Sequence, residues 1–297
     1  MKQIILIDAY AQIYRSFFAL RGLSNQQGEP VNALYGMARF LLGLDEHLGS
    51  DYGAAVFDKG KCKRRIRILP QYKAQRPPMP DALRAQVEPI RVWMQAFGWP
   101  LLEQEGLEAD DIIGCIASQS EELPLGILSY DKDLAQLVNA RVSLLQPGKN
   151  NSWLRQGVQE VQEKFGVRPE QIVDYLALLG DASDNIPGVP GVGPKTAAKL
   201  LGQFGSIEKL LANLGEAGGA RLQENLEQSV ELLQRNRELV RLELDCLPNW
   251  QGAESIRRSA PDWPKIRELA LEQGFKSLLP GIERKLGDSD PRQPDLF

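Results

Sequence analysis

Short apolar runs alternate with longer stretches of helical periodicity over the first half of the chain. The runs are rich in Ile, Val, Leu and Ala, and they are typical of buried parallel strands. They cover residues 3–8, 53–58, 99–102, 125–129 and 142–145. Between them, apolar residues recur at helical spacing, as in residues 31–48 and 81–98. Strands that alternate with helices predict an α/β fold with a mostly parallel wound sheet and helices on both faces.

The pattern changes beyond about residue 168, where helical periodicity replaces the short apolar runs. The predicted helical stretches are residues 169–180, 194–204, 206–214 and 222–242. We therefore expect an α/β domain at residues 1–167 and a helical domain at 168–285. Residues 286–297 are polar and contain proline, which predicts a flexible tail.

Acidic residues follow the apolar runs, at the ends of the predicted strands or in short loops. The nine carboxylates are Asp8, Asp58, Glu108, Asp110, Asp111, Asp131, Asp133, Asp181 and Asp184. Ligands of wound sheets gather beyond the carboxyl ends of the strands, so one edge brings together acids that are distant in sequence. Carboxylates at one edge repel each other unless cations lie between them, and hard divalent ions prefer oxygen ligands. The pattern predicts a site for two Mg²⁺ or Mn²⁺ ions, which is typical of phosphodiester cleavage.

A basic segment, residues 59–76, carries eight Lys or Arg residues and no acid. Most charge runs of this kind are solvated surface loops. Here Tyr72 stands beside Lys73 and close to Arg76, which combines a ring for base stacking with two phosphate-binding cations. We interpret the basic segment as a clamp for a nucleic-acid strand. Arg15 is also within reach of a phosphate, although a surface ion pair explains it nearly as well.

A hairpin at residues 185–197 is rich in glycine and proline and leads into a predicted helix. Its glycines permit tight turns and leave backbone amides uncovered. Amides at a helix N-terminus bind phosphate oxygens, and a lysine there adds positive charge. An ordinary interhelical turn is the alternative, but the length of the pattern favours a grip on a DNA backbone without base reading. The residues that we expect to bind DNA here are Gly188, Gly191, Val192, Gly193, Lys195 and Thr196.

Composition narrows the chemistry further. A chain of 297 residues with 43% hydrophobic and 25% charged residues is ordinary for a globular protein. The three cysteines form no C-x-x-C pair, which predicts neither a disulfide framework nor a zinc site. The single histidine, His47, has no nucleophile arranged around it, so we expect catalysis by metal-activated water. No apolar stretch suits a membrane span or a signal peptide, so we expect a cytoplasmic protein without a membrane partner.

These motifs resemble the 5′-nuclease (flap endonuclease) family, and especially the 5′→3′ exonuclease domain at the amino terminus of bacterial DNA polymerase I. The resemblance rests on the segments ILIDAY, VFD, YKAQRPPMP, EADDIIG, DKDLAQLV and GDASDNIPGVPGVGPKTAAKLL. It implies a PIN or resolvase-like α/β core with a basic helical arch near residues 59–90. It also implies that the helical domain is of the helix-three-turn-helix (helix-hairpin-helix) type. No polymerase sequence follows, so we expect a stand-alone homologue.

The resemblance also assigns roles to individual residues. It implies that one metal ion is held by a first acidic group, consisting of Asp8, Asp58, Glu108, Asp110 and Asp111. A second ion would be held by a second acidic group, consisting of Asp131, Asp133, Asp181 and Asp184. Tyr72, Lys73 and Arg76 match the base of the arch through which the 5′ strand passes, and Arg15 matches a basic residue that contacts the scissile phosphate. The hairpin matches an element that binds duplex DNA, often with a K⁺ ion.

We therefore predict a 5′→3′ exonuclease or flap endonuclease that acts on DNA with 5′ flaps, nicks or RNA-primed 5′ ends, in replication or repair. Two alternatives stay open. A PIN-type metal-dependent RNase shares the acidic sheet edge but normally lacks the hairpin domain, and a non-catalytic DNA-binding adaptor does not require intact carboxylates. The C-terminal QPDLF resembles the bacterial sliding-clamp-binding pentapeptide, which predicts contacts through Gln293, Leu296 and Phe297.

Overall fold

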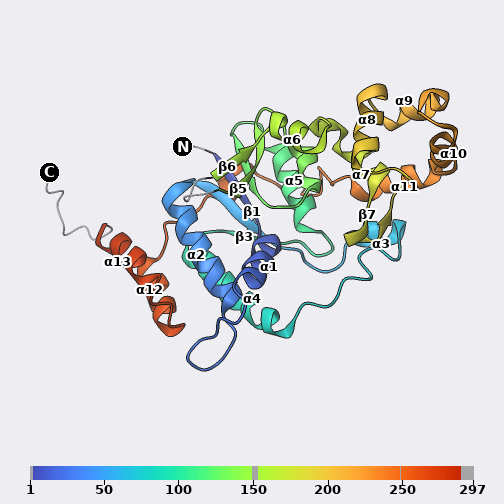
Figure 1. The fold of residues 1–297 in the computed structure, drawn as a ribbon. Helices are drawn as coiled ribbons and strands as arrows, with labels where there is room; N and C mark the ends of the chain where they lie inside the picture. The colour runs from blue at the N-terminus through green and yellow to red at the C-terminus, as the bar shows by residue number, and fades with distance from the viewer. Residues whose placement is uncertain (1–2, 149–152, 248, 289–297) are drawn as a thin grey trace.

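The computed structural model describes residues 3–148, 153–247 and 249–288, and it is built on a six-stranded sheet with strand order β3-β2-β1-β4-β5-β6 (Figure 1). The strands are β1 (Ile4–Asp8), β2 (Tyr52–Val56), β3 (Leu101–Leu102), β4 (Leu125–Leu128), β5 (Val142–Pro147) and β6 (Trp153–Gln156). Neighbouring strands from β3 to β5 are parallel, whereas β6 pairs with β5 in the antiparallel sense. The predicted fold class is confirmed, while β6 adds an antiparallel edge that the apolar pattern did not predict.

The sheet separates two hydrophobic cores because successive residues of a strand point to opposite faces. In β1, Ile4 and Leu6 belong to one core, and Ile5 and Ile7 belong to the other. The core of Ile5 and Ile7 includes residues of α1 (Ala9–Ala19), α2 (Asn32–His47) and α4 (Asp81–Ala96). The core of Ile4 and Leu6 includes residues of α5 (Ala109–Gln119) and of the helical part of the chain. Helices therefore cover both faces, as predicted.

The helical part follows α6 (Val158–Phe165), which lies within the predicted α/β domain. Its helices are α7 (Ile172–Leu179), α8 (Pro194–Phe204), α9 (Ile207–Ala212), α10 (Ala220–Gln228) and α11 (Val230–Val240). The prediction of one long helix over residues 222–242 is wrong, because the helix breaks at Ser229, whose N–H bonds Leu226 O only three residues back. Serine weakens a helix interior, and the break lets Leu226 and Leu233 enter the same core.

Two short strands interrupt this helical part, although the sequence pattern predicted none there. β7 (Gly180–Asp181) and β8 (Ile186–Pro187) pair in the antiparallel sense, with Asp181 opposite Ile186. They enclose a turn that contains the 3₁₀ helix η3 (Ala182–Asp184). The pairing fixes two predicted metal ligands, Asp181 and Asp184, within one small loop.

The last two helices return to the α/β core. α12 (Trp263–Glu272) and α13 (Leu279–Asp288) lie beside α2, at the opposite end of the molecule from α8–α10 (Figure 1). The ring of Trp263 meets Phe97 at 5.7 Å between centroids, and Phe275 meets Tyr35 at 5.2 Å. The end of the predicted helical domain, residues 168–285, thus packs on α2 and α4 of the α/β part, because its aromatic residues join the core of these helices. None of the described helices combines the length and apolar character that a membrane crossing needs.

Candidate active site

The carboxyl ends of β2, β1 and β4 bring three predicted site residues to one edge of the sheet. β1 ends at Asp8, while Asp58 and Asp131 follow β2 and β4 within three residues. These strands are neighbours in parallel register, so their ends lie side by side. Asp8 accepts a hydrogen bond from Ala11 N at 3.2 Å and another from Ser129 Oγ at 2.7 Å. Burial, with a smaller contribution from the charge of Asp58, raises the pKa of Asp8 to about 7.

The start of α5 supplies the other three residues of the first acidic group. They are Glu108, Asp110 and Asp111. Because a helix N-terminus presents free amides, Asp58 Oδ1 accepts a hydrogen bond from Ala109 N at 2.6 Å, which ties β2 to α5. Glu108 Oε1 accepts a hydrogen bond from Lys73 Nζ at 2.6 Å. Although burial raises it, Lys73 and Arg65 hold the pKa of Glu108 below its ordinary value.

Asp111 is engaged by Arg65 of α3 (Lys63–Ile68). Arg65 donates to both carboxylate oxygens of Asp111, at 2.6 and 2.8 Å, and also donates to Glu108 at 2.6 Å. The residue is only 2% exposed. The basic segment was interpreted as a nucleic-acid clamp, and this interpretation is wrong for Arg65, because a guanidinium buried among carboxylates cannot reach a phosphate.

The second acidic group surrounds an open pocket of about 340 Å³. One carboxylate oxygen each from Asp133, Asp181 and Asp184 lies within 4.8 Å of the others. Asp133 Oδ1 is buried and has no hydrogen-bond partner among the described residues. Burial, followed by the charge of Asp131, raises the pKa of Asp133 well above its ordinary value. A buried orphan oxygen within an all-oxygen ligand set fits a hard divalent cation.

Residues of the basic segment join the two acidic groups. Tyr72 Oη lies 3.0 Å from both Glu108 Oε2 and Asp184 Oδ2. Lys73 has a left-handed backbone, with φ 54°, and its N–H donates to Asp184 O at 3.0 Å. Arg76 Nη2 donates to Asp184 Oδ1 at 2.5 Å. The predicted residues Tyr72, Lys73 and Arg76 therefore lie at the acidic edge, between elements that are far apart in the sequence.

Arg15 stands apart from these ion pairs. It is exposed on α1, and its guanidinium carbon lies 4.1 Å from the centroid of the Tyr130 ring. Tyr130 lines the pocket of the second acidic group together with Arg76 and Lys132. The surface ion pair considered for Arg15 is not formed among the described residues, so its charge is available beside this pocket.

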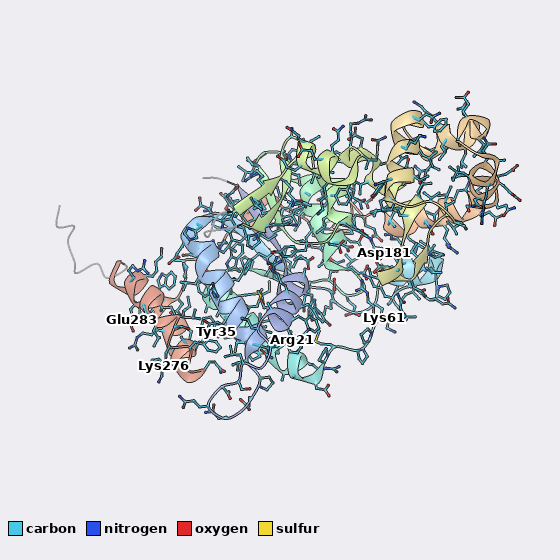
Figure 2. All side chains as sticks on the ribbon, in the orientation of Figure 1. Arg21, Tyr35, Lys61, Asp181, Lys276 and Glu283 are labelled. Carbon is cyan, nitrogen blue, oxygen red and sulfur yellow. The ribbon has the colours of Figure 1, made fainter. Side chains whose placement is uncertain are left out.

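The hairpin begins directly after the turn that carries Asp181 and Asp184, and Figure 2 shows Asp181 between the α/β part and the helices α8–α10. A Cβ at Gly188 would lie 2.0 Å from Leu179 O, so the hairpin packs on the end of α7 without room for a side chain. Gly191 has φ 80°, and Gly193 precedes Pro194 at the start of α8. The structure thus gives the glycines two roles, close packing at Gly188 and turn geometry at Gly191.

The remaining predicted residues of the hairpin differ in accessibility. Val192 is buried and its N–H donates to Val189 O at 3.1 Å, so this amide is engaged within the turn. Lys195 is exposed, and Thr196 is partly buried in the first turn of α8, where amides lack helical partners. Gly193, Lys195 and Thr196 therefore form the accessible start of α8.

Two residues that sequence reasoning missed make contacts at this site. Asn236 of α11 is fully buried, and its Nδ2 donates to Pro187 O at 2.7 Å and to Ala177 O at 3.0 Å, which fixes the hairpin to α7. A polar residue at a core position of a helical pattern was the available signal. Lys132 forms an ion pair with Asp181 at 2.9 Å. In the sequence it stands between Asp131 and Asp133, which gave no indication that its partner is Asp181.

A mostly parallel sheet with acidic residues gathered at its carboxyl edge, next to a helical hairpin unit, is the arrangement expected of a metal-dependent nuclease. Two family models cover most of the chain. The 5′-3′ exonuclease N-terminal resolvase-like domain matches residues 3–166, and the 5′-3′ exonuclease C-terminal SAM fold matches residues 167–263. The chain therefore belongs to the 5′-3′ exonuclease family, which confirms the resemblance seen in its motifs.

Individual relatives agree with this assignment. The chain is 38% identical to a 5′-3′ exonuclease of Aquifex aeolicus over 96% of both chains. It is 40% identical to DNA polymerase I of Bacillus subtilis over 99% of this chain but only 33% of the polymerase. A flap endonuclease of bacteriophage T5, in a complex with DNA and metal ions, shares the fold with a TM-score of 0.67 at 24% identity, over 91% of this chain and 99% of that one. The catalytic core of Rad2 with DNA substrate has a TM-score of 0.62 at 15% identity, over 94% and 92%.

Proposed function

We propose that this nuclease is a structure-specific 5′→3′ exonuclease and flap endonuclease that hydrolyses DNA near 5′ flaps, nicks or RNA-primed 5′ ends. The observation that carries the proposal is the convergence of both acidic groups with Tyr72, Lys73 and Arg76 at one sheet edge. The hairpin lies directly beside this edge. The similarity to a 5′-3′ exonuclease of Aquifex aeolicus and to a T5 flap endonuclease crystallised with DNA supports the same reaction.

The proposed cofactor is Mg²⁺, with Mn²⁺ as a substitute, at two positions. Asp8, Asp58, Glu108 and Asp110 would hold one ion, with Asp111 beside them, and Asp131, Asp133, Asp181 and Asp184 would hold the other. The chemistry that bound divalent ions supply is activation of a water and neutralisation of charge on the scissile phosphate. The orphan oxygen of Asp133 and the absence of softer donors at the second acidic group, within the part of the chain that is described, favour this kind of ion.

The basic residues have a separate role in this proposal. Lys73, Arg76 and Arg15 would neutralise charge that develops on the phosphate in the transition state. Lys73 and Arg76 contact carboxylates, so an incoming phosphate would exchange one anionic partner for another. Tyr72 would hold the base of the basic segment against Glu108 and Asp184 while the 5′ strand passes.

Duplex DNA would bind at the hairpin. The accessible start of α8, with Gly193, Lys195 and Thr196, offers amides and one positive charge to phosphate oxygens. Gly188, Gly191 and Val192 would shape this surface, and a K⁺ ion at the hairpin belongs to the same proposal. The proposed division of labour is an α/β nuclease core at residues 1–167 and a DNA-binding unit that begins at residue 168.

Two further predictions accompany this function. A bacterial sliding clamp would bind Gln293, Leu296 and Phe297, which lie outside the described residues. The enzyme would act in replication or repair, in the cytoplasm, where its DNA partner is found.

The decisive experiment is cleavage of a 5′-labelled flap duplex with Mg²⁺ and with EDTA. We expect cutting at the flap junction with Mg²⁺ alone, and its loss in Asp184→Ala. Glu170→Ala is the matched control, because Glu170 is an exposed acid whose ion-pair partner is the exposed Arg168 and not a residue of the site. Binding of the same duplex in EDTA should persist in both variants.

Other outcomes would contradict the proposal in distinct ways. Intact DNA together with cleavage of single-stranded RNA would indicate a PIN-type RNase. A bound but uncleaved flap under all conditions would indicate a DNA-binding adaptor.

A further inference from the structure

The guanidinium of Arg65 makes all of its contacts within the protein, and most of them are to the first acidic group. Its Nη1 lies 2.6 Å from Glu108 Oε2, 2.6 Å from Asp111 Oδ2 and 3.7 Å from Cys62 Sγ. Its Nη2 lies 2.8 Å from Asp111 Oδ1, and its Nε donates to Leu239 O at 2.9 Å. Each nitrogen of the guanidinium is therefore bonded within the protein.

The three side chains around Nη1 have the spacing of a metal-binding group. One donor atom each from Cys62, Glu108 and Asp111 lies within 4.8 Å of the others, and all three residues are buried. The guanidinium of Arg65 stands among these donors at hydrogen-bonding distances. The charged side chain of Arg65 thus lies where the surrounding donor atoms and their burial would suit a metal ion.

We propose that Arg65 is the resident cation of the first acidic group and positions Glu108 for the reaction. Arg65 and Tyr72 hold Glu108 Oε2, which leaves Oε1 as the oxygen that faces Lys73. Arg65 also occupies both oxygens of Asp111, which removes Asp111 from the oxygens available to a divalent ion. The proposal rests on the proposed function, because it concerns which acids of that site bind metal.

The same residue joins the acidic group to the helical part. The last carbonyls of a helix lack partners within the helix. At the end of α11, Arg65 bonds Leu239 O, and its neighbour Arg64 bonds Glu238 O at 2.7 Å and Arg241 O at 2.9 Å. Any shift of α11 against α5 would pass through Arg65 to Glu108.

The first test is Arg65→Met, which removes the charge and keeps much of the volume. Unpaired buried carboxylates are destabilising, so the thermal midpoint without metal should fall by about 10 °C. Mn²⁺ should restore this variant's midpoint by more than it raises that of the wild type, because the ion replaces the guanidinium. Isothermal calorimetry should count one more Mn²⁺ per chain in Arg65→Met than in the wild type. Equal midpoint increments and equal Mn²⁺ counts would overturn the proposal.

A second variant separates positioning from folding. Arg65→Met combined with Asp111→Leu removes the unpaired carboxylate and should recover most of the lost midpoint. If Arg65 only stabilised the fold, this double variant would cleave like the single variant Asp111→Leu, in which Arg65 still holds Glu108. Positioning of Glu108 predicts that the kcat of the double variant stays at least about tenfold below that of Asp111→Leu, with KM for DNA within about twofold. Equal kcat in the two variants would reject the positioning role.

Arg67→Ala is the matched control, since Arg67 lies on the same short helix as Arg65 but is exposed. It should bind the wild-type number of Mn²⁺ ions. The calorimetric count and the midpoints do not depend on turnover. A wild type that cleaves no DNA would contradict the proposed function, yet these two readouts would still decide the role of Arg65.

Discussion

The two acidic groups are similar in charge but differ in the cations that face them. In the first group, Glu108 and Asp111 share Arg65, whose side chain is 2% exposed. In the second group, Asp181 pairs with Lys132 and Asp184 pairs with Arg76, whose side chains are 41% and 50% exposed. A buried cation is part of the fold, whereas an exposed cation can turn to another anion. The comparison indicates that the first group is largely preassembled and that the second is completed by ions and substrate.

Removal of one acid from each group tests whether both are needed for turnover. Asp8→Ala and Asp131→Ala should each lower single-turnover cleavage at least about 1000-fold, because each removes a carboxylate that would hold one of the two metal ions. Binding of the flap duplex in EDTA should change little in either variant. Normal turnover in one variant would show that the acidic group of that residue is not needed for cleavage.

The exposed cations should affect turnover without affecting stability, in contrast to Arg65. Arg76→Ala should reduce cleavage about 100-fold, since it removes a charge beside the phosphate. The thermal midpoint should move by less than about 2 °C, because Arg76 is half exposed and Asp184 keeps its contacts with Tyr72 and Lys73. Arg168→Ala, at an exposed ion pair, should change neither quantity. A large fall in the thermal midpoint of Arg76→Ala would show that the cations of both acidic groups stabilise the fold.

A pH titration sharpens the contrast within the first group. Burial raises the pKa of Asp8 from 3.8 to about 7, whereas Lys73 and Arg65 hold the pKa of Glu108 low despite its burial. The unfolded chain loses the Asp8 proton first, so metal-free stability should fall as pH rises from about 4 to about 7 and then level off. Mg²⁺ affinity should rise over the same range, because the ion displaces the proton.

Thermal midpoints in EDTA and Mg²⁺ calorimetry between pH 5 and pH 8 measure both effects, with Asp8→Asn as the comparison. The variant should lose a part of the pH dependence of its midpoint. An unchanged slope in Asp8→Asn would assign the titration to other acids of the site.

The smallest expected effect concerns the hairpin beside the second group. Gly188→Ala places a Cβ about 2.0 Å from Leu179 O, so the turn with Asp184 must shift. We expect its thermal midpoint to fall by about 5 °C, as for overpacked sites. Gly193→Ala is the control, because no atom lies within 4 Å of its Cβ position and its φ is −103°. Equal midpoints for the two variants would show that the hairpin is not held by this contact.

Much of the fold follows from local patterns. The parallel strands and their flanking helices are visible as apolar runs and helical periodicity, and their carboxyl ends explain why Asp8, Asp58 and Asp131 meet. The break at Ser229 and the return of α12 and α13 were not predicted. Both depend on partners distant in sequence, such as the core around Leu226 and the aromatic contacts of Phe275.

The candidate site shows the same limit. The acids were identified by type and position, and the structure brings them to one edge, although their roles as metal ligands stay predictions. Arg65 could not be distinguished from Lys63 or Arg67 in the sequence, because all three are basic residues of one short helix. Only the packing of α3 against α5 and α11 buries one and leaves the other two exposed.

The return of the chain to the sheet has a mechanical consequence. Arg257 forms a bridge with Tyr52 of β2, Ser259 N bonds Gly98 O, and α12 then packs beside α4. The helical unit is therefore attached to the α/β part at both of its ends, as an inserted domain is, and not through a single linker. A force that pulls on the hairpin is shared between two anchor points on one sheet. Heating should accordingly melt the sheet and the helical unit in a single cooperative transition.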